Sequence, residues 1–323
     1  MSNNSDLLIL GRDDVAHLLV HDGVLQCVER AFVLHSTEAG RGFPLVREFL
    51  AGGAVFGIKS GGISGDKVLG LKAAGFWPNN TTLGKEAHQA TILLVDPETG
   101  RALAVIDGNQ VTTMRTGAAG AVGLQLLSRS DSKCLCLFGT GVQAAIQLDF
   151  ALRVRPSIGT VNYLTANKKP DLGFEARFRE RCNISHSADS QRSVADADIV
   201  VTATTGKTPL FLSDAVSPGT HINAVGADTK GKRELPEGLL AKAIVFVDDL
   251  TQARQIGETQ WRPETEVTEI GTLLLKSSRF TRHADDITVF DMTGLALQDL
   301  VVADFLYQSA VAQRSGQRFP WPW

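Results

Sequence analysis

A glycine-rich segment at residues 139–144 has the residue types and spacing of a phosphate-binding turn. Gly139, Gly141 and Ala144 follow the apolar run Leu135–Phe138 and open a stretch with helical spacing. This GxGxxG/A pattern, placed between a strand and a helix, is typical of dinucleotide-binding domains. The first glycine permits the tight turn, the second lets backbone amides approach a pyrophosphate, and Ala144 allows close packing. The alternative interpretation is a plain glycine-rich turn.

The run after the next predicted strand bears on which dinucleotide would bind. Domains of this kind commonly place an acid there to bind the adenosine ribose, but no acid follows Val161–Leu164 directly. The chain continues instead as Thr165-Ala166-Asn167-Lys168-Lys169. An acid would repel the 2′-phosphate of NADP, whereas a lysine would attract it. The pattern slightly favours NADP(H) over NAD(H); the alternative is that both lysines belong to a solvated turn.

Four further charged residues are candidates for a site. Lys72 and Arg115 lie beside small apolar residues, where an unpartnered charge is costly, so each is expected to meet a ligand or a counter-charge. Arginine suits a carboxylate because its planar fork binds both oxygens. Arg47 fits an exposed strand equally well. Asp228 follows a predicted strand, where α/β sheets place ligands, although a helix N-cap is the structural alternative.

The first part of the chain predicts elements for an antiparallel sheet. Apolar spacing over residues 13–40 indicates one helix. Short strand-like runs joined by turns follow, and residues 90–108 form a clear hairpin around Pro97–Gly100. Residues 109–127, rich in alanine and glycine, predict a second helix.

From residue 133 onward, apolar strands alternate with helical stretches, which indicates a parallel sheet covered on both faces. A long amphipathic helix begins at Ala296, packs either on the first domain or on a partner subunit, and ends in a polar tail, residues 317–323. We therefore expect an α/β protein: a Rossmann-type parallel-sheet domain at 126–299, and an α+β domain with an antiparallel sheet at 1–125 with 300–323.

Composition excludes several classes of function. The 323 residues carry a net charge of -3 without basic blocks, so nucleic acid and anionic membranes are not expected partners. Four cysteines without a CxxC motif predict buried thiols rather than disulfides, and no spacing resembles a metal site or a covalent nucleophile. The start lacks the pattern of a secretory signal, and no apolar run is long enough for a membrane span, so a cytoplasmic protein is expected.

Several segments, in order, resemble the ornithine cyclodeaminase/mu-crystallin family. They are KAAG at 72–75, the hairpin ATILLVDPETGRALAVIDG, MRTGAAGAV, FGTGVQA, VVTATTGKTPLF, NAVGADTKGKREL and MTGLALQD. The resemblance extends from about residue 40 to 310. It implies a Rossmann domain with bound NAD(P)(H), a second domain for substrate and dimerisation, a homodimer, and chemistry between amino acids and their imines.

The resemblance also implies roles for individual residues. Arg47 and Arg115 match arginines that bind the substrate carboxylate, Lys72 matches a lysine that contacts substrate, and Thr91 matches a position near it. Asp228 matches the acid that handles the substrate amine or imine, so Asp228 and Lys72 are the expected catalytic residues. The expected cofactor-binding residues are Thr116, Gly139, Thr140, Gly141, Val142, Gln143, Thr165, Asn167, Lys168, Ala203, Thr204, Thr205, Val225, Gly226, Thr293 and Gly294.

Two features narrow the reaction. Cyclodeaminases carry a glutamate where this chain has Gly57, and its absence counts against ornithine cyclodeamination. Lys59, if it points inward, would join Arg47, Lys72 and Arg115 and suit a substrate with two carboxylates, such as iminosuccinate; otherwise it is a surface lysine. His88 is interpreted as a packed histidine. Three hypotheses follow: reduction of a 2-imino acid to an L-amino acid or the reverse, cyclodeamination with recycled NAD, and a non-enzymatic NADPH-dependent binding protein.

Overall fold

The computed structural model describes residues 6–276 and 280–322, which divide into two compact units. Unit 1 comprises Met1–Arg115 with Leu295–Trp323, and unit 2 comprises Thr116–Gly294. The first division falls inside helix α3 (Gly108–Leu127), whereas the sequence analysis placed it close to the end of that helix. Helix α3 therefore contributes residues to both units.

Unit 1 is built on an eight-stranded sheet that is antiparallel at every pairing but one. Seven strands follow the order β16-β1-β7-β6-β5-β4-β2, with β3 also paired to β4, and only β1 and β7 run parallel. The strands are β1 (Asp6–Leu10), β2 (Gly40–Gly42), β3 (Val46–Phe49), β4 (Val55–Ile63), β5 (Val68–Phe76), β6 (His88–Val95), β7 (Ala102–Asp107) and β16 (Gln317–Pro320). The hairpin predicted at 90–108 is β6 and β7.

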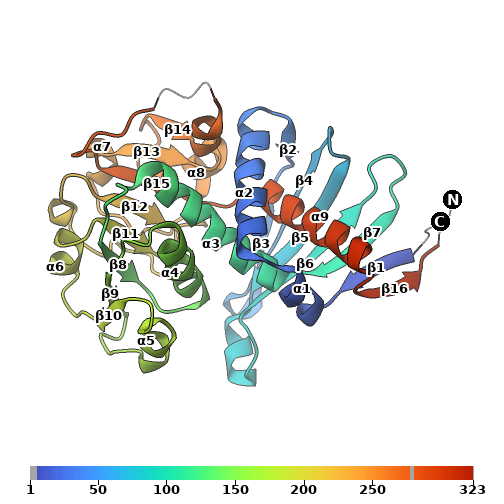
Figure 1. Ribbon diagram of the computed structural model, residues 1–323, viewed down its shortest axis with the longest axis horizontal. Helices are drawn as coiled ribbons and strands as arrows, with labels where there is room; N and C mark the ends of the chain where they lie inside the picture. Colours follow the sequence, from blue (N-terminus) through green and yellow to red (C-terminus); the bar gives the residue numbers. More distant parts are fainter. Residues whose placement is uncertain (1–5, 277–279, 323) are drawn as a thin grey trace. The chain divides into compact units, whose positions relative to one another are not determined.

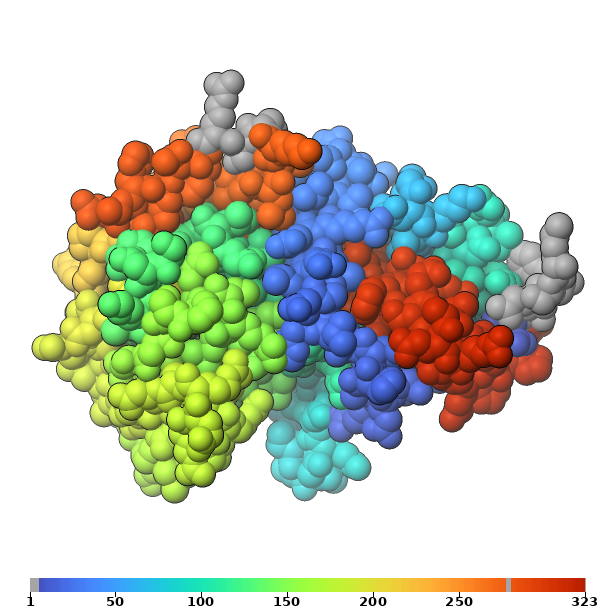
Figure 2. All heavy atoms as spheres, viewed as in Figure 1, coloured from blue at the N-terminus to red at the C-terminus, as the bar shows by residue number. Residues whose placement is uncertain are grey.

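Helices cover one face of this sheet. Helix α9 (Ala296–Gln313) runs across β4, β5 and β6, and α2 (His21–Ser36) packs beside it (Figure 1). The outer surfaces of α2, in blue, and α9, in red, lie side by side in Figure 2. The long C-terminal helix thus packs on the first sheet, one of the two expected alternatives.

Two local predictions for unit 1 are wrong. Residues 13–40 form two helices, α1 (Arg12–Leu18) and α2, because Leu19 and Val20 are extended. The spacing of the apolar residues explains the break: Leu18 and Val24 are six residues apart, which does not match a 3.6-residue helical repeat. The polar tail also contains strand β16, which pairs with β1. Backbone pairing of this kind leaves little trace in side-chain pattern.

Unit 2 is the expected Rossmann-type domain, with eight parallel strands in the order β10-β9-β8-β11-β12-β15-β13-β14. The strands are β8 (Cys134–Phe138), β9 (Thr160–Leu164), β10 (Asn183–His186), β11 (Ile199–Thr202), β12 (His221–Ala224), β13 (Ile244–Val247), β14 (Val267–Glu269) and β15 (Thr288–Asp291). The helices are α4 (Val142–Val154), α5 (Leu172–Phe178), α6 (Ser190–Ala195), α7 (Leu239–Lys242) and α8 (Leu250–Ile256). The chain reverses direction across the sheet between β8 and β11, and this switch point is where such sheets bind ligands.

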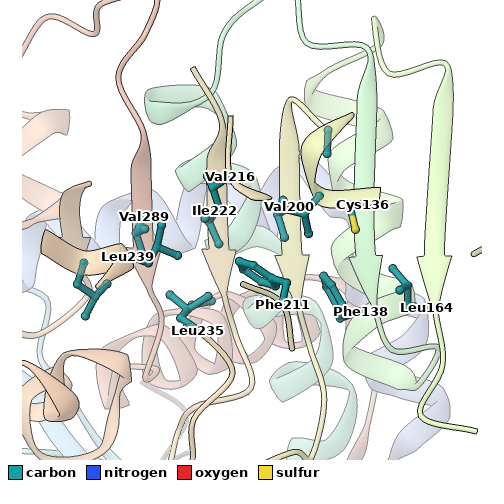
Figure 3. Close-up of a cluster of buried hydrophobic side chains, with 14 of the residues drawn as sticks. Cys136, Phe138, Leu164, Val200, Phe211, Val216, Ile222, Leu235, Leu239 and Val289 are labelled. Carbon is teal, nitrogen blue, oxygen red and sulfur yellow. The ribbon is translucent and has the colours of Figure 1, made fainter. Parts of the chain in front are cut away.

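Alternating strand residues fill two hydrophobic layers. On one face, Cys136, Phe138, Val200, Ile222 and Val289 pack with the segment around Phe211 and with α7, as Figure 3 shows. On the other face, α3 approaches β12 and β15 so closely that a Cβ at Gly123 would lie 2.6 Å from Phe290. Burial of apolar strands on both faces is the pattern that the sequence predicted, and the expected fold class is confirmed.

Candidate active site

The turn after β8 is shaped for close approach of a ligand. Gly139 has a φ of 105°, which side chains rarely adopt, and a Cβ there would lie 2.7 Å from the carbonyl oxygen of Ala203. Its N–H donates to the carbonyl of Leu164 at 2.9 Å, which ties the turn to the end of β9. The first position of the fingerprint thus requires glycine for the fold itself.

Gly141 is the N-cap of helix α4, and it differs from Gly139. Its φ of -70° is open to any residue, and a Cβ would meet no described atom within 4 Å. No described side chain caps the first turn of α4, and Val142 at its start is 62% exposed. The leading N–H groups of a helix attract anions, so glycine here keeps the approach to them clear. These residues fit a dinucleotide pyrophosphate.

The loops after β11 and β12 are held together by Glu234, a residue that the sequence analysis did not single out. Its carboxylate accepts hydrogen bonds from Thr204 N (2.7 Å), Thr204 Oγ1 (2.6 Å) and Gly226 N (2.9 Å). Glu234 is fully buried, and this burial raises its pKa although the hydrogen bonds oppose the shift. Ala203–Thr205 and Val225–Gly226, all predicted to border a cofactor, are thereby fixed at one edge of the sheet.

Asp248 fixes the loop after β15 in the same way. It accepts hydrogen bonds from Thr293 N at 2.8 Å, from Thr293 Oγ1 at 2.6 Å and from Gly294 N. Gln252 also donates to Thr293 Oγ1 (2.7 Å) and to the Gly294 carbonyl (2.8 Å). The predicted pair Thr293–Gly294 therefore lies in a rigid turn at the carboxyl edge of the parallel sheet.

The predicted ribose-binding segment forms a tight turn after β9. Thr165 Oγ1 donates to the Lys169 carbonyl (2.7 Å) and accepts from Lys169 N (3.1 Å), and Asn167 Oδ1 also accepts from Lys169 N (3.0 Å). Lys168 has a φ of 56°, and both lysines are exposed. Asp171, further along, accepts from Phe174 N and from Thr140, which links this segment to the glycine turn.

Three further residues that were predicted to bind the cofactor lie in helices α3 and α4. Val142 and Gln143 lie in the first turn of α4. The carbonyl of Thr116, in α3, accepts a hydrogen bond from Gln147 of α4 at 2.7 Å, and both residues are buried. Thr116 thus contributes to the packing of two helices in unit 2.

Asp228 lies beyond β12 with 48% of its side chain exposed. Its Oδ1 is 2.8 Å from Lys232 Nζ and accepts a hydrogen bond from Thr229 Oγ1 at 3.1 Å. Lys232 also donates to the Gly226 carbonyl at 3.2 Å, which folds this segment back on itself. The next helix, α7, begins at Leu239, so the alternative of Asp228 as a helix N-cap is wrong.

In unit 1, the strand register gathers cations on the face covered by α9. Lys59 of β4 lies directly opposite Lys72 of β5, and Arg47 of β3 lies opposite Gly57, two residues before Lys59. Opposed residues in antiparallel strands share a face, as do residues two apart. A Cβ at Gly70, two residues before Lys72, would lie 2.9 Å from Leu300 of α9, which identifies the face. Lys59 therefore points to the same side as Lys72.

Lys72, Asp299 and Arg115 form a buried ionic cluster. Lys72 Nζ lies 2.7 Å from Asp299 Oδ2 and donates to Thr112 Oγ1 at 3.2 Å, and Arg115 Nε lies 3.3 Å from Asp299 Oδ1. Burial, together with the charges of Arg115 and Lys59, lowers the pKa of Lys72 to about 7, although Asp299 opposes the shift. Burial alone would raise the pKa of Asp299, but Lys72 and Arg115 hold it below its usual range.

Asp299 and its neighbour Gln298 are residues that sequence reasoning missed. Both are buried in the first turn of α9, and Gln298 Oε1 accepts a hydrogen bond from Arg115 Nη1 at 3.1 Å. A signal was present in the sequence: these two adjacent polar residues directly precede the apolar run Leu300–Ala303 of the helix. Polar side chains at buried positions require hydrogen-bond partners or opposite charges nearby.

His88 and Thr91 lie on opposite faces of β6. His88 is on the face of Lys72; burial and the charges of Lys72 and Arg115 lower its pKa to about 4, so its ring is neutral. Thr91 pairs with Ala73, one residue beyond Lys72, so it points to the other face, where it is exposed. The structure therefore brings Arg47, Lys59, Lys72 and Arg115 together on one side of unit 1, but not Thr91.

Comparison with known proteins identifies the family. The family model described as "Ornithine cyclodeaminase/mu-crystallin family" matches residues 8–314. The chain belongs to this family. It is 34% identical over 313 residues to the iminosuccinate reductase of Paracoccus denitrificans, covering 94% of this chain and 97% of that protein. These matches confirm the family that the sequence motifs resemble.

Two solved structures of family members show the same fold. An archaeal alanine dehydrogenase dimer with bound NAD superposes with a TM-score of 0.90 at 32% identity, covering 97% of this chain and 99% of that chain. The Δ1-pyrroline-2-carboxylate reductase of Thermococcus litoralis, in complex with NADH and L-proline, gives 0.89 at 27% identity, covering 96% and 99%.

The described residues contain neither a candidate metal cluster nor a membrane-spanning helix. No group of three or more His, Cys, Asp or Glu side chains within 6–276 and 280–322 is arranged to hold a metal ion. No helix in the same ranges is both long enough and apolar enough to span a membrane.

Proposed function

We propose that the protein catalyses the NAD(P)H-dependent reduction of a 2-imino acid to an L-amino acid, or the reverse dehydrogenation. Its relatives named above reduce or dehydrogenate compounds of this class. The observation that carries the proposal is the cluster of Lys59, Lys72 and Arg115 on one face of unit 1. A group of cations of this kind, with Lys72 buried at its centre, suits an anionic substrate.

Unit 2 supplies the residues for the cofactor. Gly139 and Gly141 would hold the pyrophosphate at the start of α4, and the loops fixed by Glu234 and Asp248 would border the nicotinamide half. When bound, the reduced cofactor supplies a hydride to the imine carbon. The exposed lysines after β9, with no acid directly following the strand, slightly favour NADPH over NADH.

The chain's own residues orient the substrate and handle its proton. Arg115, Lys72 and Arg47 would bind the carboxylate next to the imine, and Asp299 fixes the first two. Asp228 would stabilise the iminium charge or transfer the proton that nitrogen gains when the C=N bond is reduced. Lys59, directly opposite Lys72, would bind a second carboxylate, so the favoured substrate is a dicarboxylic imine such as iminosuccinate.

Gly57 argues against the cyclodeaminase alternative. A Cβ at this position would lie 2.9 Å from the carbonyl oxygen of Val46, on the paired strand β3. A glutamate could be placed here only if β3 moved. The acid expected to handle a side-chain amine in ornithine cyclodeamination is therefore absent from this position.

The face of the unit 1 sheet opposite α9 supports a homodimer. Leu71, Ala73 and Leu93 of neighbouring strands lie on that face and remain partly exposed. An apolar sheet face of this kind needs a cover, and the alanine dehydrogenase relative was solved as a dimer. We propose that a second copy of the chain covers it; a monomer by light scattering at micromolar protein would refute this.

The decisive experiment follows NADPH and NADH oxidation at 340 nm with 2-oxo acids and excess ammonia. Oxaloacetate supplies a dicarboxylic imine, and pyruvate and glyoxylate supply monocarboxylic ones; cyclic ketimines are tested in parallel. We expect turnover with the highest kcat/KM for oxaloacetate. Ammonia release from ornithine or lysine without net cofactor consumption would establish cyclodeamination instead. Cofactor binding without turnover on any imine would establish a binding protein.

A further inference from the structure

Gln298 in the first turn of α9 is fully buried, and both hydrogen bonds that its side chain makes use one atom. Its Oε1 accepts from the backbone N–H of Leu295 and from Arg115 Nη1, each at 3.1 Å. Both partners are donors, so they fix the orientation of the amide group: the oxygen must face them.

The Nε2 of the same amide is a buried donor. Among the residues that the structure describes, none accepts a hydrogen bond from it. Native proteins leave few buried donors without an acceptor, and such atoms call for an explanation in terms of a ligand or a catalytic role. The orientation cannot be reversed, because an NH₂ group facing Arg115 and Leu295 N would place donors against donors.

The position of Nε2 indicates the kind of acceptor. The two amide atoms share one carbon, so Nε2 lies beside the guanidinium of Arg115. The adjacent residue, Asp299, pairs with Arg115 and Lys72, so two cations and one carboxylate gather at this end of α9 and leave an excess of one positive charge. An oxygen acceptor that enters here would be stabilised most if it carried negative charge, as a carboxylate oxygen does.

We propose that Gln298 is a substrate-binding residue whose Nε2 donates to the carboxylate oxygen that Arg115 also binds. This inference rests on the proposed function and adds a neutral, directional donor to the cations. The direction matters because the amide is held by Leu295 and Arg115 before substrate arrives. Gln298 would therefore fix the carboxylate plane, whereas Lys72 supplies mainly charge.

The variants Q298E and Q298M separate this role from a structural one. Glutamate at this helix position preserves the oxygen that accepts from the backbone N–H of Leu295 and from Arg115. It replaces the donor with an acceptor and adds a negative charge. Methionine keeps a similar length and removes donor and acceptor without adding charge. Both variants are compared with the native protein for NADH binding, which a substrate-binding role leaves unchanged, and for unfolding, which verifies that each variant folds.

The readout is calorimetric titration of the protein, loaded with NAD⁺, with succinate as an unreactive dicarboxylate and with succinamate as its half-amide. We expect succinate to bind about tenfold or more weakly to each variant, the usual loss for a hydrogen bond to a charged group. Succinamate offers an N–H, so in Q298E its affinity should fall less than that of succinate. This change in preference does not require Q298M to fold.

Three results would overturn the inference. Native affinity for succinate in folded Q298M would show that the donor does not contribute. An equal loss for both ligands in Q298E would show an effect of charge or of structure alone. Failure of the native protein to bind succinate, pyruvate or any other carboxylate at millimolar concentration would instead refute the proposed function itself, and this result is distinguishable from the other two.

Discussion

Lys72 and Asp299 form an ion pair of 2.7 Å between the middle of a strand and the first turn of the C-terminal helix, with side chains only 5% and 1% exposed. Charges removed from water in this way are costly unless each is compensated by the other. The pair therefore links the position of Lys72, the lysine proposed to bind the substrate, to the packing of α9 on β5.

We predict that Asp299→Asn destabilises the protein by about 3–5 kcal/mol, the range for removing one partner of a buried pair. The reason is that Lys72 and Arg115 would lose the carboxylate between them. Urea unfolding measures the change. The double variant Lys72→Met with Asp299→Leu is the control, and it should recover the part of the loss that comes from Lys72, whereas Arg115 still lacks the carboxylate. A single variant within about 0.5 kcal/mol of the native protein would contradict the prediction.

Lys59 is predicted to select for the second carboxylate. Lys59→Met should raise KM for the oxaloacetate-derived imine about tenfold or more, while KM for the pyruvate-derived imine changes by less than about threefold. Steady-state kinetics at 340 nm compares the two substrates. Lys85→Met, which removes an exposed lysine from the same unit, is the matched control and should change neither value. Equal effects on both substrates would show that Lys59 does not distinguish them.

The sequence predicts the parallel sheet and its cofactor turn well, because their signals are local. The run from Leu135 to Ala144 contains the strand, the turn and the helix start, and the structure places them as expected. The grouping of the cations is not local in this sense, because the face of the sheet to which Lys59 points depends on how β4 pairs with β5, which carries Lys72. The sequence alone does not fix that register.

Other features required contacts that are distant in sequence. Glu234 and Asp248 fix loops that carry predicted cofactor residues. Asp248 lies outside the recognised motifs, and Glu234 lies within a segment quoted for the family resemblance, but the sequence does not show which loops either carboxylate holds. Gln298 and Asp299 belong to a segment quoted for the family resemblance, but their partners Lys72 and Arg115 become visible only when α9 packs on the sheet. Thr91 also depends on the strand pairing, since strand alternation turns it away from the face of Lys72.

Gly139 and Gly141 are predicted to respond differently to alanine. Gly141→Ala should leave stability within about 0.5 kcal/mol, because no described atom obstructs its Cβ and its backbone angles are ordinary. Its Cβ would obstruct the pyrophosphate, so NADH binding measured by fluorescence should weaken about tenfold or more. Gly139→Ala, with its φ of 105° and a 2.7 Å contact, should reduce stability as well. Native NADH affinity in Gly141→Ala would refute the assigned pyrophosphate position.

Glu258 is predicted to make stability depend on pH. Burial, with repulsion from Asp291, raises the pKa of Glu258 to about 8 in the folded protein, against 4.5 as its ordinary value. Between these values the folded state binds more protons than the unfolded state, so this group makes the free energy of unfolding fall as pH rises from about 5 to 8. Glu258→Gln retains an oxygen to accept from Glu234 N, a bond of 2.6 Å in the native protein.

The variant Glu258→Gln should therefore be more stable than the native protein at pH 8–9, by on the order of 2 kcal/mol, and should lose the advantage near pH 5. Urea unfolding across this pH range measures both curves. Glu237→Gln, at an exposed position of the same unit, serves as the control and should follow the native curve. Parallel curves for Glu258→Gln and the native protein would show that Glu258 does not titrate in this range.

Asp228 and Lys232 are predicted to affect turnover in different degrees. Asp228→Asn keeps the size of the side chain but removes the charge that would stabilise the iminium or transfer its proton, so kcat should fall about 10²–10⁴-fold. Lys232→Met removes the cation 2.8 Å from Asp228 and the bond to the Gly226 carbonyl, while the carboxylate itself remains. Its kcat should fall by a smaller factor, about tenfold, because Lys232 acts only through Asp228.

NADH affinity in Asp228→Asn should stay native, which separates a loss of catalysis from a loss of cofactor binding. Full turnover in Asp228→Asn would remove Asp228 from the mechanism, and a larger loss in Lys232→Met than in Asp228→Asn would indicate that Lys232 itself is the group that acts on the substrate.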